Sequence, residues 1–201
     1  MNDTTIDYYN NNAKSFISNT IDCEFSEIQD KFLNYLNNSA MILDLGCGSG
    51  RDSKYFINKG FNVTALDGSQ ELCKVAENII GQKVVCQDFR NLEYNNKFDG
   101  IWACASLLHL RKEEIKTVII KCIEALKTNG IFYCSFKYGN YEGNRNGRYF
   151  TDLTEEEFNK VISEINNIQI KEIFVSNDVR KGRENEQWLN IFIKKLSNFP
   201  Y

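Results

Sequence analysis

Short apolar runs recur from residue 41 onward, and segments with helical periodicity separate most of them. Seven runs predict strands, at residues 41–45, 62–66, 83–87, 100–104, 131–137, 168–175 and 188–194. These runs lack the strict alternation of apolar and polar residues that marks a half-exposed strand. Nearly continuous apolar runs are typical of strands buried on both faces of a parallel sheet. The last two runs have no helix between them, so they predict an antiparallel hairpin.

Helical patterns fill the intervals. One apolar stripe repeats at helical spacing and predicts a helix through Ile115, Val118, Ile119, Cys122, Ile123 and Leu126. Capping boxes at Ser26-x-x-Gln29 and Thr154-x-x-Glu157 predict two helix starts. Before the first strand, residues 5–18 and the segment after Ser26 predict two further helices, which are too short for a domain and are expected to form a cover.

Alternating strands and helices predict an α/β fold with right-handed crossovers. We expect a Rossmann-like three-layer sandwich with a seven-stranded, mostly parallel sheet in the order 3-2-1-4-5-7-6, strand 7 being antiparallel. The apolar run at 188–194 suits a central position better than a sheet edge. The chain is expected to be one domain, with residues 1–39 as a helical lid and 40–201 as the α/β core.

Composition narrows the class of protein. The 201 residues are 42% hydrophobic and 25% charged, with a net charge of −3, as in an ordinary globular domain. No apolar run reaches the roughly 20 residues of a membrane helix, and residues 1–12 lack the layout of a secretory signal. We therefore expect a cytoplasmic protein without a membrane partner. The net negative charge gives no general attraction for a nucleic acid.

The seven cysteines are scattered and form no C-x-x-C pair. Neither a zinc site nor a disulfide framework is indicated, and several of the cysteines fall within apolar runs, where cysteine acts as a small hydrophobe. We expect reduced thiols and no metal.

The most informative stretch runs from Leu43 to Gly50, where a buried strand ends in D-x-G-x-G-x-G and passes into a helix. Glycines allow a sharp turn and a close approach to a ligand, and the helix start offers free N–H groups. A dinucleotide fingerprint would need glycine at position 51 or 53, which hold Arg51 and Ser53. The carboxylate of Asp44 suits a ligand that carries an ammonium group better than a pyrophosphate.

Residues 44–50 resemble motif I of the class I S-adenosylmethionine-dependent methyltransferases, and the resemblance extends from residue 41 to about residue 137. It implies S-adenosyl-L-methionine as cofactor and S-adenosyl-L-homocysteine as product. In this family the acidic residue at the end of the second strand binds the ribose hydroxyls. An acidic side chain and a backbone N–H at the end of the third strand bind adenine, and the end of the fourth strand lies beside the sulfonium. The implied cofactor residues are Asp44, Gly46, Cys47, Gly48, Ser49, Gly50, Arg51, Asp67, Gly68, Ser69, Gln87, Asp88, Phe89, Ala103, Cys104 and Ala105.

Within this class the chain looks like the compact methyltransferases grouped with tellurite-resistance enzymes. The likeness rests on segments 105–109, 135–139, 147–151 and 186–190, together with Arg51-Asp52-Ser53. Gly147-Arg148-Tyr149-Phe150 followed by an acidic helix also resembles tRNA wobble-uridine methyltransferases. Neither grouping fixes the acceptor.

We expect the acceptor site at the carboxyl edge of strands four and five, roofed by the first helix and walled by loops 138–148 and 178–186. Substrate candidates are Tyr138, Arg148, Tyr149, Arg180 and Arg183, whose guanidinium groups would bind an anionic acceptor. His109, the single histidine, is either a packed helix-entry residue or a general base. Tyr9 either packs or lays its ring near the sulfonium.

The sequence therefore predicts an enzyme that methylates a small molecule, either anionic or a soft nucleophile. Such an acceptor needs alignment and the exclusion of water more than it needs a base. Two alternatives remain open at this point: a tRNA or other nucleic-acid methyltransferase, and a non-catalytic module that binds S-adenosylmethionine.

Overall fold

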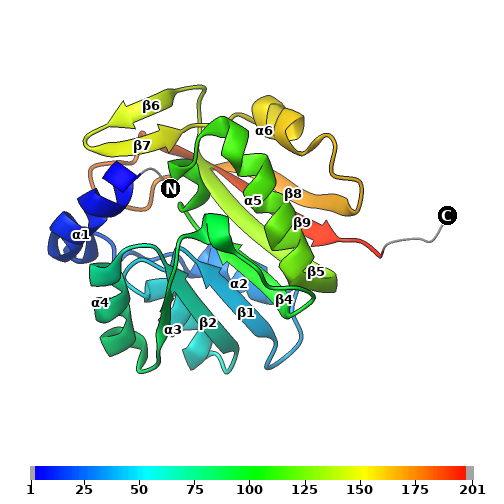
Figure 1. Cartoon of the computed structure of the whole chain (residues 1–201), viewed down its shortest axis with the longest axis horizontal. Helices are drawn as coiled ribbons and strands as arrows, with labels where there is room; N and C mark the ends of the chain where they lie inside the picture. Colours follow the sequence, from blue (N-terminus) through cyan, green and yellow to red (C-terminus); the bar gives the residue numbers. More distant parts are fainter. Residues whose placement is uncertain (1–2, 198–201) are drawn as a thin grey trace.

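The central sheet holds seven strands in the order β3-β2-β1-β4-β5-β9-β8 in the computed structural model, which describes residues 3–197 (Figure 1). A separate two-stranded sheet pairs β6 with β7. The strands are β1 Met41–Leu45, β2 Asn62–Asp67, β3 Val84–Cys86, β4 Phe98–Ala103, β5 Leu126–Lys137, β6 Glu142–Arg145, β7 Arg148–Thr151, β8 Ile168–Asn177 and β9 Gln187–Lys195. The helices are α1 Asp3–Ser18, α2 Ser26–Leu33, α3 Arg51–Asn58, α4 Gln70–Ile80, α5 Lys112–Ala125 and α6 Glu155–Ile162, with short 3-10 turns η1 Phe89–Asn91 and η2 Leu107–His109.

The predicted sheet is confirmed. The sixth and seventh predicted strands are β8 and β9, and β9 is antiparallel to both of its neighbours, β5 and β8. The pairs among β1 to β5 are parallel. The β9 segment Leu189–Ile193, which is apolar except for Asn190, is buried between its neighbours as its largely apolar sequence predicts.

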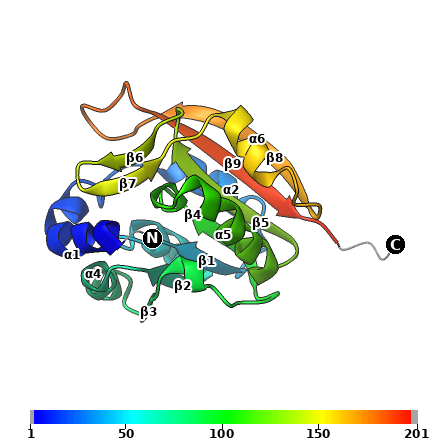
Figure 2. The ribbon, with the colours of Figure 1, turned by 45° about the horizontal axis from the view of Figure 1, so that its top comes forward.

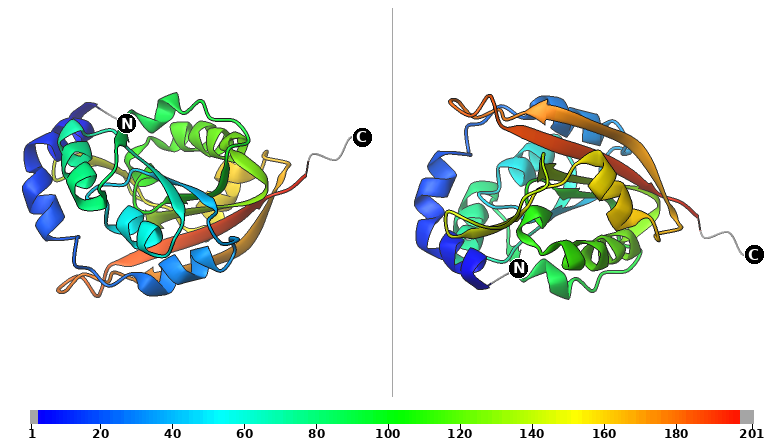
Figure 3. Two further views of the ribbon diagram at one scale, coloured as in Figure 1. Left: turned by 90° about the horizontal axis from the view of Figure 1, so that it is seen from below. Right: turned by 90° about the horizontal axis from the view of Figure 1, so that it is seen from above.

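Two apolar layers hold helices against the sheet. On one face α5 and α6 pack over fully buried side chains that include Phe136 and Phe158. On the other face α2 and α3 pack around Phe32, Phe56 and Trp102, and α4 lies beside α3. Figure 3 shows α2 and α6 on opposite sides of β8 and β9. The sheet is therefore buried on both faces, which explains the apolar strand sequences.

Segment 138–148 was predicted as a loop, and this was wrong. It contains β6, and Asn146 and Gly147 form a two-residue turn to β7 with φ angles of 51° and 80°. Positive φ at both central positions is the geometry of a type I′ hairpin, for which Asn-Gly is the preferred sequence. Figure 2 shows this hairpin beside α1 at one end of the molecule.

The two N-terminal helices pack against different parts of the central sheet. Helix α1 has a kink at Asn12 and lies over the carboxyl ends of β1, β2 and β4. Helix α2 does not roof this edge, because it buries Phe32 against the sheet face. The Ser26 capping box is also wrong: helix α2 has Phe25 as its N-cap, without a side-chain cap, and Gln29 donates instead to Asp52. The Thr154 cap is confirmed by its hydrogen bond from the Glu157 N–H.

Candidate functional site

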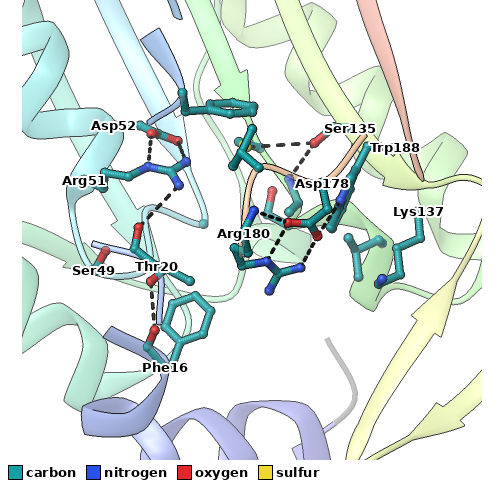
Figure 4. Close-up of a pocket in the computed structure, with 18 of the residues that line it drawn as sticks. Phe16, Thr20, Ser49, Arg51, Asp52, Ser135, Lys137, Asp178, Arg180 and Trp188 are labelled. Atoms are coloured by element: carbon teal, nitrogen blue, oxygen red, sulfur yellow. Dashed lines mark hydrogen bonds and ion pairs between the residues drawn. The ribbon is translucent and has the colours of Figure 1, made fainter. Parts of the chain in front are cut away.

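One cavity opens at the carboxyl ends of β1, β2, β4 and β5, beneath α1 (Figure 4). Its walls come from the glycine loop, α1, the turn after β4, β5, β7 and the β8–β9 loop. The lining side chains and glycines are Tyr9, Phe16, Thr20, Phe25, Gly46, Cys47, Gly48, Ser49, Arg51, Asp52, Asp67, Leu72, Cys104, Ala105, Ser106, Leu108, His109, Ser135, Lys137, Arg148, Phe150, Ser176, Asn177, Asp178, Val179, Arg180, Arg183, Trp188 and Asn190.

The glycine loop lines the part of the cavity that lies at the end of β1. The N–H groups of Gly46 and Cys47 both donate to the Leu66 carbonyl oxygen, at 2.7 and 2.9 Å, which fixes the turn against β2. Gly46 has a φ of +82°, and a Cβ there would lie 2.4 Å from the Ser106 Cβ. At Gly48, with φ +55°, a Cβ would lie 3.1 Å from the Phe16 ring of α1. Both backbone conformations favour glycine, and at Gly46 a side chain would also clash with Ser106.

Asp67 ends β2 and is 7% exposed. Its Oδ2 accepts from the Gly48 N–H at 2.9 Å and its Oδ1 from the Ser69 N–H at 2.8 Å. Burial raises the pKa of this carboxyl, and the backbone N–H groups of Ser69, Gly48 and Gly68 oppose that rise. Each carboxylate oxygen keeps an accepting position beyond these bonds. The side chain is thus a fixed, cavity-lining acceptor that joins the glycine loop to the end of β2.

A buried acidic network stands beside the glycine loop. Asp52 Oδ1 accepts from Arg51 Nε and Gln29 Nε2, both at 2.7 Å, and its Oδ2 accepts from Trp102 Nε1 at 2.8 Å. Asp44 lies behind the loop, is 2% exposed, and accepts from the Ser53 hydroxyl at 2.6 Å. Burial and the nearby Asp52 hold the pKa of Asp44 well above its usual range.

The end of β4 bends sharply at the cavity. Ala105 has a φ of +51°, unusual for a residue with a side chain, and its N–H donates to the Ser135 hydroxyl at 2.9 Å. Burial raises the pKa of the Cys104 thiol to about 12, and burial also raises the pKa of Cys47. Both cavity thiols are therefore protonated at neutral pH and are poor nucleophiles.

Tyr9, His109 and Arg148 form a chain of hydrogen bonds under α1. His109 Nδ1 lies 2.7 Å from the Tyr149 carbonyl oxygen, which can only accept, so Nδ1 carries the proton. Nε2 then accepts from the Tyr9 hydroxyl at 2.8 Å, and the Tyr9 oxygen accepts from Arg148 Nη1 at 3.2 Å. Burial, together with the charge of Arg148, lowers the pKa of His109 to about 4. The imidazole is neutral at pH 7.

Ion pairs neutralise much of the opposite wall. The Asp178 carboxylate, 2% exposed in its side chain, accepts from Arg180 and from Trp188 Nε1. Burial would raise the pKa of Asp178, but the Arg180 hydrogen bonds outweigh it and hold the pKa at about 2. Lys137 pairs with Glu186, and Arg183 lies 3.7 Å from the same carboxylate. Figure 4 shows Lys137, Asp178, Arg180 and Trp188 across the cavity from Arg51 and Asp52.

The structure brings many of the predicted residues together. The cavity is lined by Gly46, Cys47, Gly48, Ser49, Arg51, Asp67, Cys104 and Ala105 from the predicted cofactor set, by Tyr9 and His109, and by Arg148, Arg180 and Arg183. The predicted residues outside its walls are Asp44, Gly50, Gly68, Ser69, Gln87, Asp88, Phe89, Ala103, Tyr138 and Tyr149.

Most of the outlying residues have structural partners that explain their place. Phe89 is fully buried in the core, Gly50 is the N-cap of α3, and the Ser69 hydroxyl caps α4. Asp88 caps η1 and pairs with Arg90. The Tyr149 hydroxyl donates to Glu142, and only the carbonyl oxygen of Tyr149 faces His109.

Several lining residues were not predicted as site residues, chiefly Phe25, Asp52, Lys137, Asp178 and Trp188. The Asn146-Gly147 pair carried a hairpin signal that would have placed Arg148 at the start of a strand. Asp52, Lys137 and Trp188 lie in segments that carried the family likeness, and Asp178 begins the predicted wall 178–186, whereas Phe25 carries no local signal. Within residues 3–197, no helix is long and apolar enough to cross a membrane, and no cluster of His, Cys, Asp or Glu is arranged to hold a metal.

Comparison with known proteins gives the class. Residues 42–130 match the methyltransferase domain family. An uncharacterized methyltransferase of Staphylococcus carnosus (strain TM300) is 26% identical over 152 residues, which cover 68% of this chain and 73% of that protein. A ubiquinone biosynthesis O-methyltransferase of Rickettsia canadensis (strain McKiel) is 30% identical over 95 residues, or 45% of this chain and 39% of the relative. This chain thus spans well under half of that second protein.

A solved structure shows the same fold. The 1,6-didemethyltoxoflavin-N1-methyltransferase of Burkholderia thailandensis, with bound 1,6-didemethyltoxoflavin and S-adenosylhomocysteine, superposes with a TM-score of 0.73 at 20% identity. The match covers 96% of this chain and 85% of that one. The matched domain, the relatives and the shared fold support an S-adenosylmethionine-dependent methyltransferase with S-adenosylmethionine as its cofactor.

Proposed function

We propose that the protein transfers the methyl group of S-adenosylmethionine to a small-molecule acceptor within the cavity beneath α1. The observation that carries the proposal is the continuity of this cavity, which joins the glycine loop and Asp67 to the wall of Arg148, Asp178 and Trp188. A module that only binds the cofactor would not need this second wall. The Burkholderia enzyme was solved with both 1,6-didemethyltoxoflavin, a small molecule, and S-adenosylhomocysteine bound, which supports a small-molecule acceptor.

The residues of the first wall fit the cofactor. Gly46 and Gly48 leave the backbone open where a Cβ would intrude, and Asp67 offers a fixed acceptor pair suited to ribose hydroxyls. When bound, the cofactor supplies an electrophilic methyl group on a sulfonium and keeps the electron pair of the broken carbon–sulfur bond. Rings of Tyr9 and Phe16 line the same space, and such faces favour a cationic sulfonium.

The chain positions the acceptor rather than deprotonating it. The neutral His109 has its only lone pair occupied by the Tyr9 hydroxyl, and its pKa of about 4 makes it a weak base. Burial raises the pKa of Tyr9. We therefore assign His109 and Tyr9 to holding α1 in place, and we expect an acceptor atom that is nucleophilic at neutral pH. Its lone pair forms the new bond to carbon.

The ion pairs on the second wall argue against a nucleic-acid acceptor. Lys137, Arg180 and Arg183 each have a carboxylate partner, so they do not form a track of free cations for phosphates. The narrower likeness to tellurite-resistance enzymes stays a prediction.

The test is transfer of label. The protein is incubated with S-adenosylmethionine labelled in its methyl group and with a cell extract separated into ultrafiltrate, protein and nucleic acid. Label should enter the ultrafiltrate, and the Asp67→Ala variant should lose this transfer. Label in RNA would contradict the small-molecule acceptor, and cofactor binding without transfer to any fraction would indicate a binding module. The rate should also be flat from pH 6 to 8 if no base is used.

A further inference from the structure

Five cationic side chains line the cavity, and one differs from the rest. Arg51 pairs with Asp52, Lys137 and Arg183 with Glu186, and Arg180 with Asp178. Arg148 has no carboxylate partner among residues 3–197. Each of the other four has a carboxylate partner, with Glu186 shared by Lys137 and Arg183, so Arg148 is the cavity cation without such a partner in this part of the chain.

Aromatic side chains surround the Arg148 guanidinium. It lies 4.7 Å from the Tyr8 ring centroid, 5.7 Å from that of Tyr9 and 5.0 Å from that of Phe150. Nη1 donates to the Tyr9 hydroxyl, while the buried Nε has no hydrogen-bond partner among the described residues. Ring faces attract a cation but do not satisfy its N–H groups. An unpaired, partly desolvated guanidinium is costly unless a ligand completes its hydrogen bonds.

The protein fixes this group in position. Arg148 begins β7 directly after the Asn146-Gly147 turn, opposite Arg145 in the hairpin register. Gly147 packs so closely on α1 that a Cβ there would lie 3.0 Å from the Tyr8 ring. The Tyr149 N–H donates to Thr5 of α1 at 3.0 Å. The hairpin and α1 therefore hold the guanidinium together, which lowers the entropy lost when it binds a ligand.

We propose that Arg148 binds an anionic oxygen group, a carboxylate or a phosphate, on the methyl acceptor. The inference rests on the proposed function and names its substrate class. A guanidinium presents parallel N–H donors that match such oxyanions, and Arg148 lines the cavity from the start of β7. It also contacts Tyr9, so a bound anion would tie the acceptor to the helix that roofs the site.

The experiment measures binding of three small probes to the protein loaded with S-adenosylhomocysteine. Benzoate and phenyl phosphate carry the oxyanion, and benzamide is the neutral counterpart of benzoate. Titration calorimetry should give a dissociation constant for at least one anion about tenfold lower than for benzamide. Arg148→Gln should remove this preference, Arg148→Lys should restore part of it, and all variants should bind S-adenosylhomocysteine within about twofold of wild type. Arg145→Gln, in the same hairpin but paired with Asp152 outside the cavity, is the matched control and should keep the preference.

Three results would overturn the inference. One is that neither benzoate nor phenyl phosphate binds more tightly than benzamide, or that neither anion binds at all. Another is a preference that survives in Arg148→Gln, and the third is a loss of S-adenosylhomocysteine affinity in that variant, which would assign Arg148 to the cofactor. Failure of the wild-type protein to bind S-adenosylhomocysteine would instead refute the proposed function itself.

Discussion

The two walls of the cavity are built differently. The wall proposed for the cofactor, here the cofactor wall, comes from β1 and its glycine loop, which backbone hydrogen bonds join to Asp67 and the end of β2. The acceptor wall comes from α1, β5, β7 and the β8–β9 loop, which meet only in the folded chain, and it is built from side chains paired with one another. The first wall is fixed by backbone geometry, whereas the second is held together by hydrogen bonds and ion pairs between side chains.

The largest effect should come from Gly46, at the base of the cofactor wall. A methyl group there would overlap Ser106, 2.4 Å away, in a backbone conformation of φ +82° that favours glycine. We expect Gly46→Ala to lower the free energy of unfolding by about 3–5 kcal/mol. Gly60→Ala is the control, because its φ is +89° but nothing lies within 4 Å of the added Cβ. Urea unfolding of both variants measures the difference; equal losses would mean that Ser106 yields freely.

The next effect concerns His109, which is hydrogen-bonded to Tyr9 of α1 and to the carbonyl oxygen of Tyr149 in β7. Its folded-state pKa of about 4 lies below the ordinary 6.5, so the unfolded chain binds the proton more tightly. The resulting stability is fully present above pH 6.5 and is lost as the pH falls through 6.5 toward 4. The loss should reach about 3 kcal/mol. The free energies of unfolding of wild type and His109→Gln, plotted against pH, should therefore converge on acidification. Parallel plots over this pH window would contradict the neutral, buried imidazole.

The third effect is the contribution of Asp67 to the binding of S-adenosylhomocysteine. Asp67→Ala removes the buried carboxylate that we propose as the acceptor for the ribose hydroxyls, and it should weaken S-adenosylhomocysteine binding by about 2–3 kcal/mol. Calorimetry gives the value, and Asp7→Ala, an exposed carboxylate on α1 outside the cavity, serves as the control with unchanged affinity. A folded Asp67→Ala protein that binds as wild type would remove Asp67 from the cofactor site.

The contrast between the walls also explains what sequence reasoning could reach. Strand order, the antiparallel β9 and the glycine loop follow from apolar runs and a contiguous motif, and the sheet is confirmed. The β6–β7 hairpin was missed although Asn146-Gly147 signals it, because a polar, glycine-containing segment was interpreted as a loop. The partner of Gln29 was also missed: its side chain bonds to Asp52, 23 residues away, instead of capping its own helix. Such partners depend on packing and leave no trace in local spacing.

The smallest effects separate the two arginines of the β8–β9 loop, which the sequence alone could not rank. Arg180 pairs with Asp178, whose side chain is 2% exposed, whereas Arg183 is 47% exposed and 3.7 Å from Glu186. Arg180→Ala leaves a buried carboxylate with fewer donors and should cost about 1–3 kcal/mol of unfolding free energy. Arg183→Ala should cost under about 0.5 kcal/mol, because exposed pairs are screened by water. Because both cations are already paired, neither change should alter S-adenosylhomocysteine affinity by more than about twofold. Urea unfolding of the two variants measures the change in unfolding free energy, and titration calorimetry measures the affinity for S-adenosylhomocysteine. Equal costs for the two would show that the Asp178 pair is not the element that holds this wall in place.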